Sequence, residues 1–414
     1  MKKTILLCGL LTSLSAIGYA NSGNLNGGVR NFREGNFVGA VTDLQPLSHK
    51  GDAGGQYYIG LMYLNGQGLP KDDAQAFQWF GKSAKQGYAR AQNALGELYF
   101  YARGTPRNHE QAQFWFRKAA NQNLAAGQRN LGYTYLALNP HDYQKGVFWL
   151  KKAARQGDEI DQLILANLYH SQREVQDDTK SAYWMRKAAD QGVADAQNAL
   201  GDCYLYGLGV PDNITQALTW YQKADSQGHI EAAYNIAQIY EQGKRVPRDS
   251  ALASHWYCKA AKLDNENAIY NLSNGRVDCL ADLANQGQVL AQAELGRWYA
   301  REIEPTPKNY PGYVTAAFWS RKAAEQGNGA ALNRLGDLYA QGLGVPLEPV
   351  ISQMLYIIAR PKSSGGEHSS RIRETLSESQ INEARALAKS WKEGTPLPER
   401  SVTWEIPHAI PAEP

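Results

Sequence analysis

The sequence predicts an all-α fold, a solenoid of antiparallel helix pairs stacked one after another. Three observations predict it. An apolar residue followed by a small one recurs along the chain, a tryptophan follows all but the last of these pairs, and consecutive tryptophans in the unbroken part are 34 to 36 residues apart. Self-similarity at such a period is typical of helix-pair repeats, in which each unit packs only on its neighbours.

Residues 195–230 read as one complete unit of this array. Gly207 and Gly209 supply left-handed backbone at the end of a first helix, and Pro211 cannot continue a helix. Asn213 is placed to cap a second helix, which ends near Gly228. Residues spaced three and four apart predict the buried faces of the two helices, namely Ala196, Ala199, Leu200, Cys203 and Tyr204 in the first and Ala217, Trp220, Tyr221 and Ala224 in the second.

The recurring positions have physical reasons. Glycine inside a helix costs roughly 1 kcal/mol against alanine, so its retention in most of the apolar-small pairs predicts a helix crossing too tight for a Cβ. A buried tryptophan removes about 150–250 Å² from water, worth roughly 4–6 kcal/mol gross, so each one is expected to be a buried wedge against the next helix pair. The copies of Leu200–Gly201 are Ile59–Gly60, Leu95–Gly96, Leu131–Gly132, Leu165–Ala166, Ile236–Ala237, Leu295–Gly296 and Leu335–Gly336, and those of Trp220 are Trp79, Trp115, Trp149, Trp184, Trp256 and Trp319.

These motifs resemble those of a known repeat family. The segment LGDCYLYGLGVPDNITQALTWYQKADSQG, together with LGELY, WFRKAANQ, WLKKAARQG, WMRKAADQG and WSRKAAEQG, resembles the Sel-one-like repeat family, a branch of the tetratricopeptide superfamily. The resemblance rests on a Leu-Gly pair, a G-x-G-V-P turn and a W-x-x-K-A-A-x-x-G tail in fixed order. It implies a right-handed α-solenoid that binds proteins or acts as an adaptor, with no catalytic residue belonging to the repeat.

Residues 1–20 have the pattern of a signal peptide. Lys2 and Lys3 precede a short apolar run, and small residues favour cleavage near Ala20. The run is shorter than the ~20 apolar residues of a spanning helix, and no other long apolar run occurs, so no transmembrane segment is expected. In a bacterium the mature chain would be periplasmic or secreted. Its 41 basic and 40 acidic residues leave it nearly neutral, which favours neither nucleic acid nor an acidic membrane surface as a partner.

The array itself is expected over residues 54–345. Residues 21–53 form a degenerate capping repeat, with helices expected at 29–33 and 36–47, because the terminal unit of a solenoid has one face in water. Two irregularities interrupt the array, a shortened repeat near 265–289 and an insertion near 303–313 that carries three prolines. They are either drift or a place where the curvature changes and a partner docks. Second helices start at short polar residues suited to capping, namely Asp72, Asn108, Asp142, Asp177, Asn213 and Asp249.

Residues 346–393 are expected to form C-terminal capping helices. A helix through 351–358 and a polar loop at 361–370 lead to Ser377 and Gln380, which match a capping box at the start of a further helix. This segment resembles the closing helix of bacterial members of the family. Residues 394–414 are rich in proline and are expected to be extended or disordered, with Trp404 and Ile406 able to dock on the array or on a partner.

Three cysteines remain in the mature chain. An exported chain meets an oxidising compartment, in which pairing is allowed. Cys279 takes the tryptophan position of the shortened repeat, judged by its eight-residue distance from Gly287, and Cys258 lies two residues after Trp256. Cys258 and Cys279 are a candidate disulfide, with two free thiols as the alternative, and Cys203 is expected to be a small buried hydrophobe. Cysteine-rich relatives carry a regular bridged pair in each repeat, a pattern that this chain lacks.

No catalytic or metal-binding pattern stands out. The eight histidines are scattered, and H-E-x-x-H, C-x-x-C, G-x-S-x-G and G-x-x-x-x-G-K-[ST] are absent. The glycines at 66–68 and 207–209 end helices rather than follow strands, so no phosphate cradle is expected. The sequence therefore predicts a protein that is not an enzyme and that needs neither a cofactor nor a metal.

The candidate site is a surface row. In a helix-pair solenoid the first helices line the concave side, and the residues two before and two after each Leu-Gly leucine stand about one turn apart on it. The row mixes aromatic, amide and charged side chains, a composition suited to protein recognition. Its members are Tyr57, Leu61, Asn93, Glu97, Arg129, Tyr133, Leu163, Asn167, Asn198, Asp202, Tyr234, Gln238, Arg297, Asn333 and Asp337.

These features favour an exported, non-catalytic scaffold whose concave helical surface binds a partner protein. Two alternatives stay open. Some periplasmic proteins that resemble this family act as immunity proteins that occlude type VI secretion effectors, often lipases, and the sequence fits that role as well as it fits an envelope adaptor or a host-interaction factor. The other alternative is a cell-wall-directed binding or enzyme-regulating role, for which the chain offers no nucleophile or base that would turn over cell-wall material.

Overall fold

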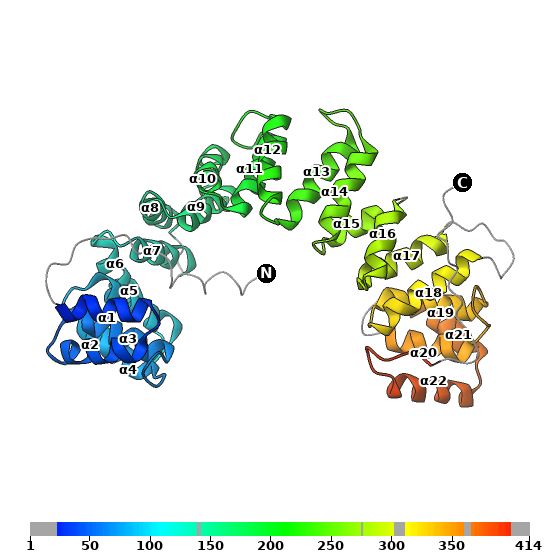
Figure 1. Ribbon diagram of the computed structural model, residues 1–414, viewed down its shortest axis with the longest axis horizontal. Helices are drawn as coiled ribbons and strands as arrows, with labels where there is room; N and C mark the ends of the chain where they lie inside the picture. Colours follow the sequence, from blue (N-terminus) through cyan, green and yellow to red (C-terminus); the bar gives the residue numbers. More distant parts are fainter. Residues whose placement is uncertain (1–22, 139–141, 275, 302–310, 360–365, 399–414) are drawn as a thin grey trace. The chain divides into compact units, whose positions relative to one another are not determined.

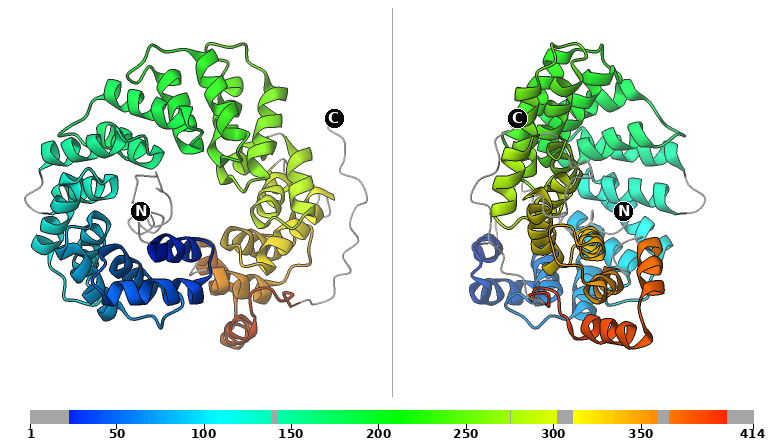
Figure 2. Two further views of the ribbon diagram at one scale, coloured as in Figure 1. Left: turned by 60° about the vertical axis from the view of Figure 1, so that its left-hand side comes forward. Right: turned by 90° about the vertical axis from the view of Figure 1, so that its right-hand side faces the viewer.

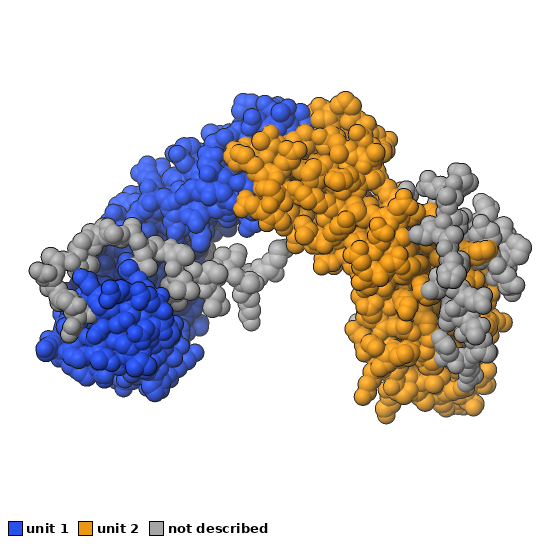
Figure 3. All heavy atoms as spheres, in the orientation of Figure 1, with its two compact units in different colours: residues 1–217 blue, residues 218–414 orange. Residues whose placement is uncertain are grey.

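The chain folds into two stacks of α-helices. The computed structural model describes residues 23–138, 142–274, 276–301, 311–359 and 366–398, and over these ranges it contains helices and turns but no strand (Figure 1). Two compact units, residues 1–217 and 218–414, meet inside helix α12 (Ile214–Asp225) (Figure 3). From α1 to α11 and from α13 to α20, each helix packs on the next one along the chain (Figure 2). The predicted all-α solenoid of helix pairs is confirmed.

Unit 1 contains a terminal pair followed by regular pairs. The helices with odd numbers are the first helices of their pairs, and those with even numbers are the second helices. The bounds are α1 (Gly23–Arg33), α2 (Phe37–His49), α3 (Ala53–Asn65), α4 (Asp73–Lys85), α5 (Ala89–Tyr101), α6 (His109–Asn121), α7 (Ala125–Ala137), α8 (Tyr143–Ala154), α9 (Glu159–Ser171), α10 (Asp178–Asp190) and α11 (Ala194–Tyr206).

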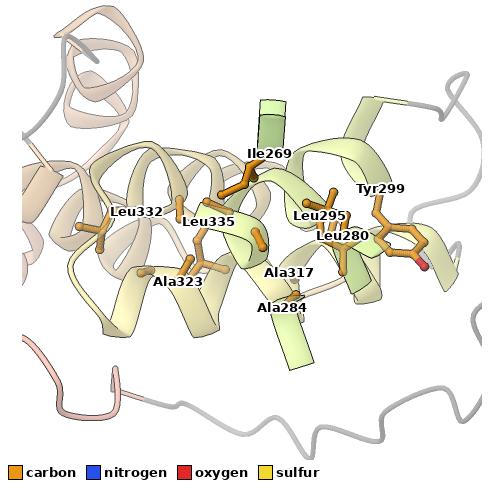
Figure 4. Packing of buried hydrophobic residues seen from close by; sticks show 14 of the residues in the cluster. Ile269, Leu280, Ala284, Leu295, Tyr299, Ala317, Ala323, Leu332 and Leu335 are labelled. Carbon is orange, nitrogen blue, oxygen red and sulfur yellow. The ribbon is translucent and has the colours of Figure 1, made fainter. Parts of the chain in front are cut away.

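Unit 2 contains the irregular part of the array and the closing helices. Its core runs through the unit, and Figure 4 shows a part of it, with Leu280, Leu295 and Leu335 among the buried residues. The bounds are α13 (Ile230–Gln242), α14 (Ser250–Ala261), α15 (Glu266–Leu272), α16 (Val277–Asn285), α17 (Val289–Arg301), α18 (Pro311–Glu325), α19 (Gly329–Gln341), α20 (Pro349–Ala359), α21 (Gly366–Thr375) and α22 (Glu378–Ser390).

The predicted starts of the second helices are confirmed. Asn213 accepts a hydrogen bond from the backbone N–H of Gln216 at 3.0 Å, which satisfies one of the unpaired donors at the start of α12. The side chains of the other five capping residues accept from backbone N–H groups in the same way, namely Asp72, Asn108, Asp142, Asp177 and Asp249. Local chemistry at the helix starts is therefore enough to place these boundaries.

The last glycine of the turn between paired helices, which follows Ala102 in one repeat and Gly207 in another, has a role that the sequence did not show. Gly104 and Gly209 have φ of 66° and 71°, and a Cβ at either would overlap the carbonyl oxygen of Asp73 or Asp178, at the start of the preceding second helix. The turn therefore lies directly on the backbone of the neighbouring pair. Only glycine allows both that contact and the left-handed conformation.

The tight crossing predicted at the Leu-Gly pair is confirmed. A Cβ at Gly60 would lie 2.7 Å from the ring of Phe80, and a Cβ at Gly96 would lie 2.7 Å from the ring of Phe116. Phe80 and Phe116 each come directly after the repeated tryptophan. The glycines of the first helix, which have no Cβ, therefore leave space for large side chains of the second helix.

The prediction that every repeated tryptophan is a buried wedge is wrong for five of the seven. Only Trp184 and Trp220 are buried, at 6% and 5% exposed, whereas the others are half-buried. The residue after each tryptophan faces the core instead, because a step of about 100° along the helix moves the tryptophan to the edge of the buried stripe. At this edge Trp79, Trp115, Trp149 and Trp256 each stack with the lysine three residues later, and Lys82 Nζ lies 4.2 Å from the ring centroid of Trp79.

A pair of glutamines, one buried and one exposed, also recurs within the repeats. In α5 and α6, Gln122 Nε2 donates to Gln92 Oε1 at 2.8 Å, and Gln92 Nε2 donates to the carbonyl of Ala84 at 3.2 Å, at the end of the preceding second helix. The pair therefore joins both helices of one repeat and satisfies a carbonyl of the repeat before. The same arrangement is found at Gln86–Gln56, Gln156–Gln128, Gln191–Gln162 and Gln326–Gln292.

The shortened repeat consists of two short helices, as predicted. Its helices α15 and α16 follow α14, and a disulfide joins Cys258 of α14 to Cys279 of α16 with a Cα–Cα distance of 5.9 Å. The candidate bridge is therefore confirmed, and Cys203 is buried and unpaired by any disulfide, as expected. The covalent link ties the irregular repeat to the regular one before it.

The ends of the chain differ in places from the expectation. The signal peptide at 1–20, most of the insertion near 303–313 and the docking residues Trp404 and Ile406 lie outside the described residues. Pro311–Tyr313 begins α18, and α21 covers the second half of the loop expected at 361–370. The capping box of Ser377 and Gln380 is present at α22. Of the expected tail, Leu397 is buried at 3% exposed, so its start packs on unit 2.

Candidate protein-binding surface

The predicted row lies on the first helices, and most of its side chains are half-buried. Asn167 is exposed, Leu61 and Asn93 are buried, and the remaining residues of the row are half-buried. Direct packing between successive first helices, α1 on α3 and α5 on α7 in unit 1, brings the rows of neighbouring repeats together. The row is therefore an ordered surface rather than a set of independent solvated side chains.

In unit 1 the row contains a cluster of amides around one carboxylate. Asn93 Nδ2 and Asn130 Nδ2 each donate to Glu97 Oε1 at 2.9 Å, and Asn130 Nδ2 also lies 2.9 Å from Asn93 Oδ1. Burial raises the pKa of Glu97, against the amide donors and Arg129, which lower it. The cluster joins α5 to α7 and fixes the carboxylate in one position.

Arg129 joins the next two first helices. Its guanidinium donates to Asp161, which is fully buried, and to Asp158 at 3.3 Å. A buried carboxylate that lost this partner would cost several kcal/mol, so Arg129 has a structural role in addition to its place in the row. Burial raises the pKa of the neighbouring Tyr133 to about 12, so this hydroxyl stays protonated and can donate to a partner.

At the start of the row, Tyr57 lies among other aromatic rings. Its ring centroid is 5.2 Å from that of Tyr58, 5.3 Å from that of Tyr88 and 5.7 Å from that of Phe80. Burial raises the pKa of Tyr57. Rings at these separations hold one another in place, which leaves a rigid aromatic patch on α3.

In unit 2 the row is organised around the neutral groups at Tyr234 and the half-buried Arg297. Gln238 Nε2 donates to the hydroxyl oxygen of Tyr234 at 2.8 Å, and Asn271 Nδ2 approaches the same oxygen at 3.4 Å. Arg297 pairs with Glu294 and donates to Ser273 Oγ at 2.7 Å. The row therefore reaches across the shortened repeat, from α13 through α15 to α17.

The comparison with known proteins follows from this architecture. The Sel1 repeat model matches the chain at residues 53–88, 89–124, 125–158, 162–193, 194–229, 230–265, 289–328 and 329–359, which make up most of it. The chain belongs to the Sel1 repeat family. The resemblance read from the sequence is confirmed, and these eight Sel1 repeats leave out the shortened repeat of α15 and α16.

The chain is similar to solved structures, and with one of them it shares the fold. The structure of c5321, a protective antigen present in uropathogenic Escherichia coli strains and displaying an SLR fold, is 29% identical, covers 88% of this chain and 90% of that chain, and has a TM-score of 0.56. A Sel1 repeat protein from Oxalobacter formigenes is 29% identical over 58% of this chain and 97% of that chain, with a TM-score of 0.48. No curated protein matches at a significant level.

As a member of the Sel1 repeat family, the chain is a scaffold of the kind that mediates protein–protein contacts. Within the described ranges, no group of three or more His, Cys, Asp or Glu side chains is placed to hold a metal ion. No helix in the same ranges is both long and apolar enough to span a bilayer. The first-helix row is the candidate contact surface of this scaffold.

Several residues of this surface were missed by the sequence prediction. Asn130 and Glu294 come directly before the leucine of the Sel1 Leu-Gly pair, a position occupied by alanine at Ala94 and Ala199. A polar residue there, which also occurs at Asn235 and Arg334, was a usable signal, since the position is apolar in the remaining repeats apart from Tyr58. Asp161 and Asn271 gave no such signal, because their roles depend on partners more than 30 residues away, Arg129 and Tyr234.

Proposed function

We propose that the chain is an exported, non-catalytic scaffold that binds a partner protein through its first-helix row. The observation that carries the proposal is the ordered cluster of Glu97, Asn93 and Asn130, held by hydrogen bonds of 2.9 Å and flanked by tyrosines. Side chains fixed before binding lose little conformational freedom on association, so more of the contact energy contributes to affinity. Tyrosine and arginine are also the residues that dominate binding energy at protein interfaces.

Three features support export. Residues 1–20 have the signal-peptide pattern, and the Cys258–Cys279 disulfide is typical of an oxidising compartment. The similar protein c5321 is a protective antigen, which supports a location that antibodies reach. Expression of the full sequence in a bacterium, followed by fractionation and mass measurement, should give a periplasmic chain that starts after Ala20. A cytoplasmic chain that keeps Met1 would contradict export.

The binding row is tested by removing two of its half-buried tyrosine side chains. Tyr133→Ala and Tyr234→Ala each delete a half-buried hydroxyl and ring, and each should weaken capture of a partner from a periplasmic extract by about tenfold or more. Phe148→Ala is the matched control, because Phe148 is 52% exposed on the second helix α8 and lies outside the row. Arg129 is unsuitable, since its loss would leave Asp161 unpaired.

The capture assays of wild type and variants can be compared only if circular dichroism shows unchanged helicity in all variants. Equal capture by wild type and both tyrosine variants would refute the row as the binding surface. The identity of the captured protein then assigns the role. A lipase or other effector that the chain inhibits would make it an immunity protein, an envelope protein would make it an adaptor, and a cell-wall enzyme would make it a regulator.

A further inference from the structure

In unit 2 the chain holds one of its own segments on the second helix α18, a turn at Glu393 and Gly394 that leads into residues 395–397. Arg321 donates to the carbonyl of Leu397, and Glu325 Oε1 accepts from the backbone N–H of Leu397 at 3.1 Å. The carbonyl of Glu325 accepts from the N–H of Gly394 at 2.8 Å. The segment 394–397 is therefore held through its backbone, by an arginine that donates and a glutamate that accepts.

Two further contacts complete this clamp. Glu325 Oε1 orients Arg321 through a bond of 3.0 Å from Nε, and the hydroxyl of Tyr339 on α19 lies 3.5 Å from Arg321 Nη1. Glu393 lies where a Cβ on Gly327 would be, so the glycine leaves room for the segment. Arg321 is 6% exposed and Tyr339 is 4% exposed, because the segment contributes to covering them.

The same set of residues occurs once more, in unit 1. Of the seven tryptophan-containing tails, only WMRKAADQG and WSRKAAEQG combine a basic residue two positions after the tryptophan with an acidic residue six positions after it. In the first of these, Arg186, Asp190 and Gly192 correspond to Arg321, Glu325 and Gly327. Tyr204 on α11 corresponds to Tyr339, and the guanidinium carbon of Arg186 lies 5.4 Å from the centroid of its ring.

The copy in unit 1 is open where the copy in unit 2 is covered. Asp190 is exposed and Arg186 is half-buried, and a Cβ added to Gly192 would meet nothing within 4 Å. Tyr183, directly before Trp184, is 55% exposed. Among the described residues of unit 1, therefore, no segment lies over Gly192 as Glu393 lies over Gly327.

We propose that the edge formed by α10 and α11 binds a turn-forming segment of a partner protein, clamped through its backbone by Arg186 and Asp190. Hydrogen bonds donated by a guanidinium or accepted by a carboxylate are stronger than those between neutral groups. Because they contact backbone atoms, they do not depend on the side chains of the bound segment. By analogy with Gly394 and Leu397, the segment carries a small residue and, three positions later, an apolar one. The chain's own segment is already held in unit 2. This second site uses helix edges outside the first-helix row and does not depend on it.

The probe is a fluorescent peptide with the sequence of residues 392–398, KEGTPLP, titrated into the full-length chain. Saturable binding is expected, and both Arg186→Ala and Asp190→Ala should weaken it by about tenfold or more, because each removes a charged hydrogen-bonding partner. Arg117→Ala is the matched control. Arg117 has the same position in α6 and bonds the hydroxyl of Tyr135 at 3.0 Å, but Asn121 replaces the acidic residue there. Its loss should leave the affinity unchanged.

Several outcomes would overturn the proposal. A wild-type chain that does not bind the peptide saturably lacks the site. Binding that persists in both Arg186→Ala and Asp190→Ala would place the peptide elsewhere, for example on α18 in exchange for the chain's own segment. Self-association that Asp190→Ala abolishes, without peptide binding, would assign the edge to a second copy of this chain. Since Asp190 is exposed, its substitution leaves the fold intact even if Arg186→Ala does not.

Discussion

Two repeats show two ways of joining one helix pair to the next. In residues 89–124, Gln92 and Gln122 bond each other, and Gln92 satisfies a carbonyl at the end of α4. In residues 230–265, Ala233 and Leu263 occupy the corresponding positions, so both members of the pair are lost together. This second repeat instead carries Cys258, which is bridged to Cys279 of the shortened repeat.

The carbonyl of Ala261, at the end of α14, is equivalent to that of Ala84 at the end of α4, and it has a side-chain partner although Ile269 takes the place of the regular glutamine. Gln288 Nε2 donates to the carbonyl of Ala261 at 3.0 Å, although it lies beyond the shortened repeat. The need to satisfy a helix end is therefore constant, while the residue that meets it changes. Where the regular glutamine pair is absent, a covalent link and a more distant glutamine hold the junction, and this contrast can be tested.

The largest effect is expected from removing the disulfide. The bridge closes a loop with a sequence separation of 21, so its loss should destabilise unit 2 by about 3 kcal/mol. Denaturant unfolding of the Cys258→Ser/Cys279→Ser double variant, followed by intrinsic fluorescence, measures the change. Reduced wild type is the control and should match the reduced double variant. An unchanged unfolding midpoint would mean that Gln288 alone holds the junction.

The next effect is expected from the glutamine pair in unit 1. Gln92→Leu removes the side-chain partner of the Ala84 carbonyl and one of the bonds of Gln122, which keeps its bond to the carbonyl of Gly87, and the change should cost about 2 kcal/mol. Adding Gln122→Leu should cost less than the sum of the two single changes, because the two side chains act as one unit. Additive losses in a double-mutant cycle would show that the pair is not coupled.

A smaller effect is expected at the helix crossing. Gly96→Ala places a Cβ 2.7 Å from the ring of Phe116, and the overpacking should outweigh the gain in helix propensity, leaving a net loss of about 1 kcal/mol. Gly81→Ala is the matched control. It lies in α4 with nothing within 4 Å of the added Cβ, so thermal unfolding should show it slightly stabilised. The same sign for both changes would argue against a tight crossing.

The smallest effect is a dependence of stability on pH. It is expected for the cluster of unit 1, which contains the carboxyl group of Glu97, and it distinguishes this cluster from the neutral one around Tyr234. Burial raises the pKa of Glu97, so the folded state binds its proton more tightly than the unfolded state does. Stability should therefore fall as pH rises from the unfolded pKa through the folded one. Glu97→Gln keeps the acceptor for Asn93 and Asn130 but removes this loss. Its melting temperature relative to wild type should rise between about pH 4 and pH 8. A constant difference would exclude the carboxylate as the cause.

Part of the candidate surface could be read from the sequence. The spacing around the Leu-Gly pair places Asn93, Glu97, Tyr234 and Gln238 on first helices. In the structure, side-chain hydrogen bonds join Asn93 to Glu97 and Gln238 to Tyr234. Asn130 was not predicted, because the reasoning used only the positions two before and two after the leucine. The structural role of Arg129 could not be predicted either, since its buried partner Asp161 lies 32 residues away.

The sequence by itself determined what depends on neighbours along the chain. Helix starts at Asp72 or Asn213, helix ends at glycine and the repeat period all follow from local backbone chemistry and periodicity. The tertiary structure decided which side of each tryptophan faces the core, how the glutamines pair, and that Arg321 holds Leu397, 76 residues further along. Those outcomes depend on surfaces that meet only after the helices pack, and a local pattern carries no information about a partner so distant in the chain.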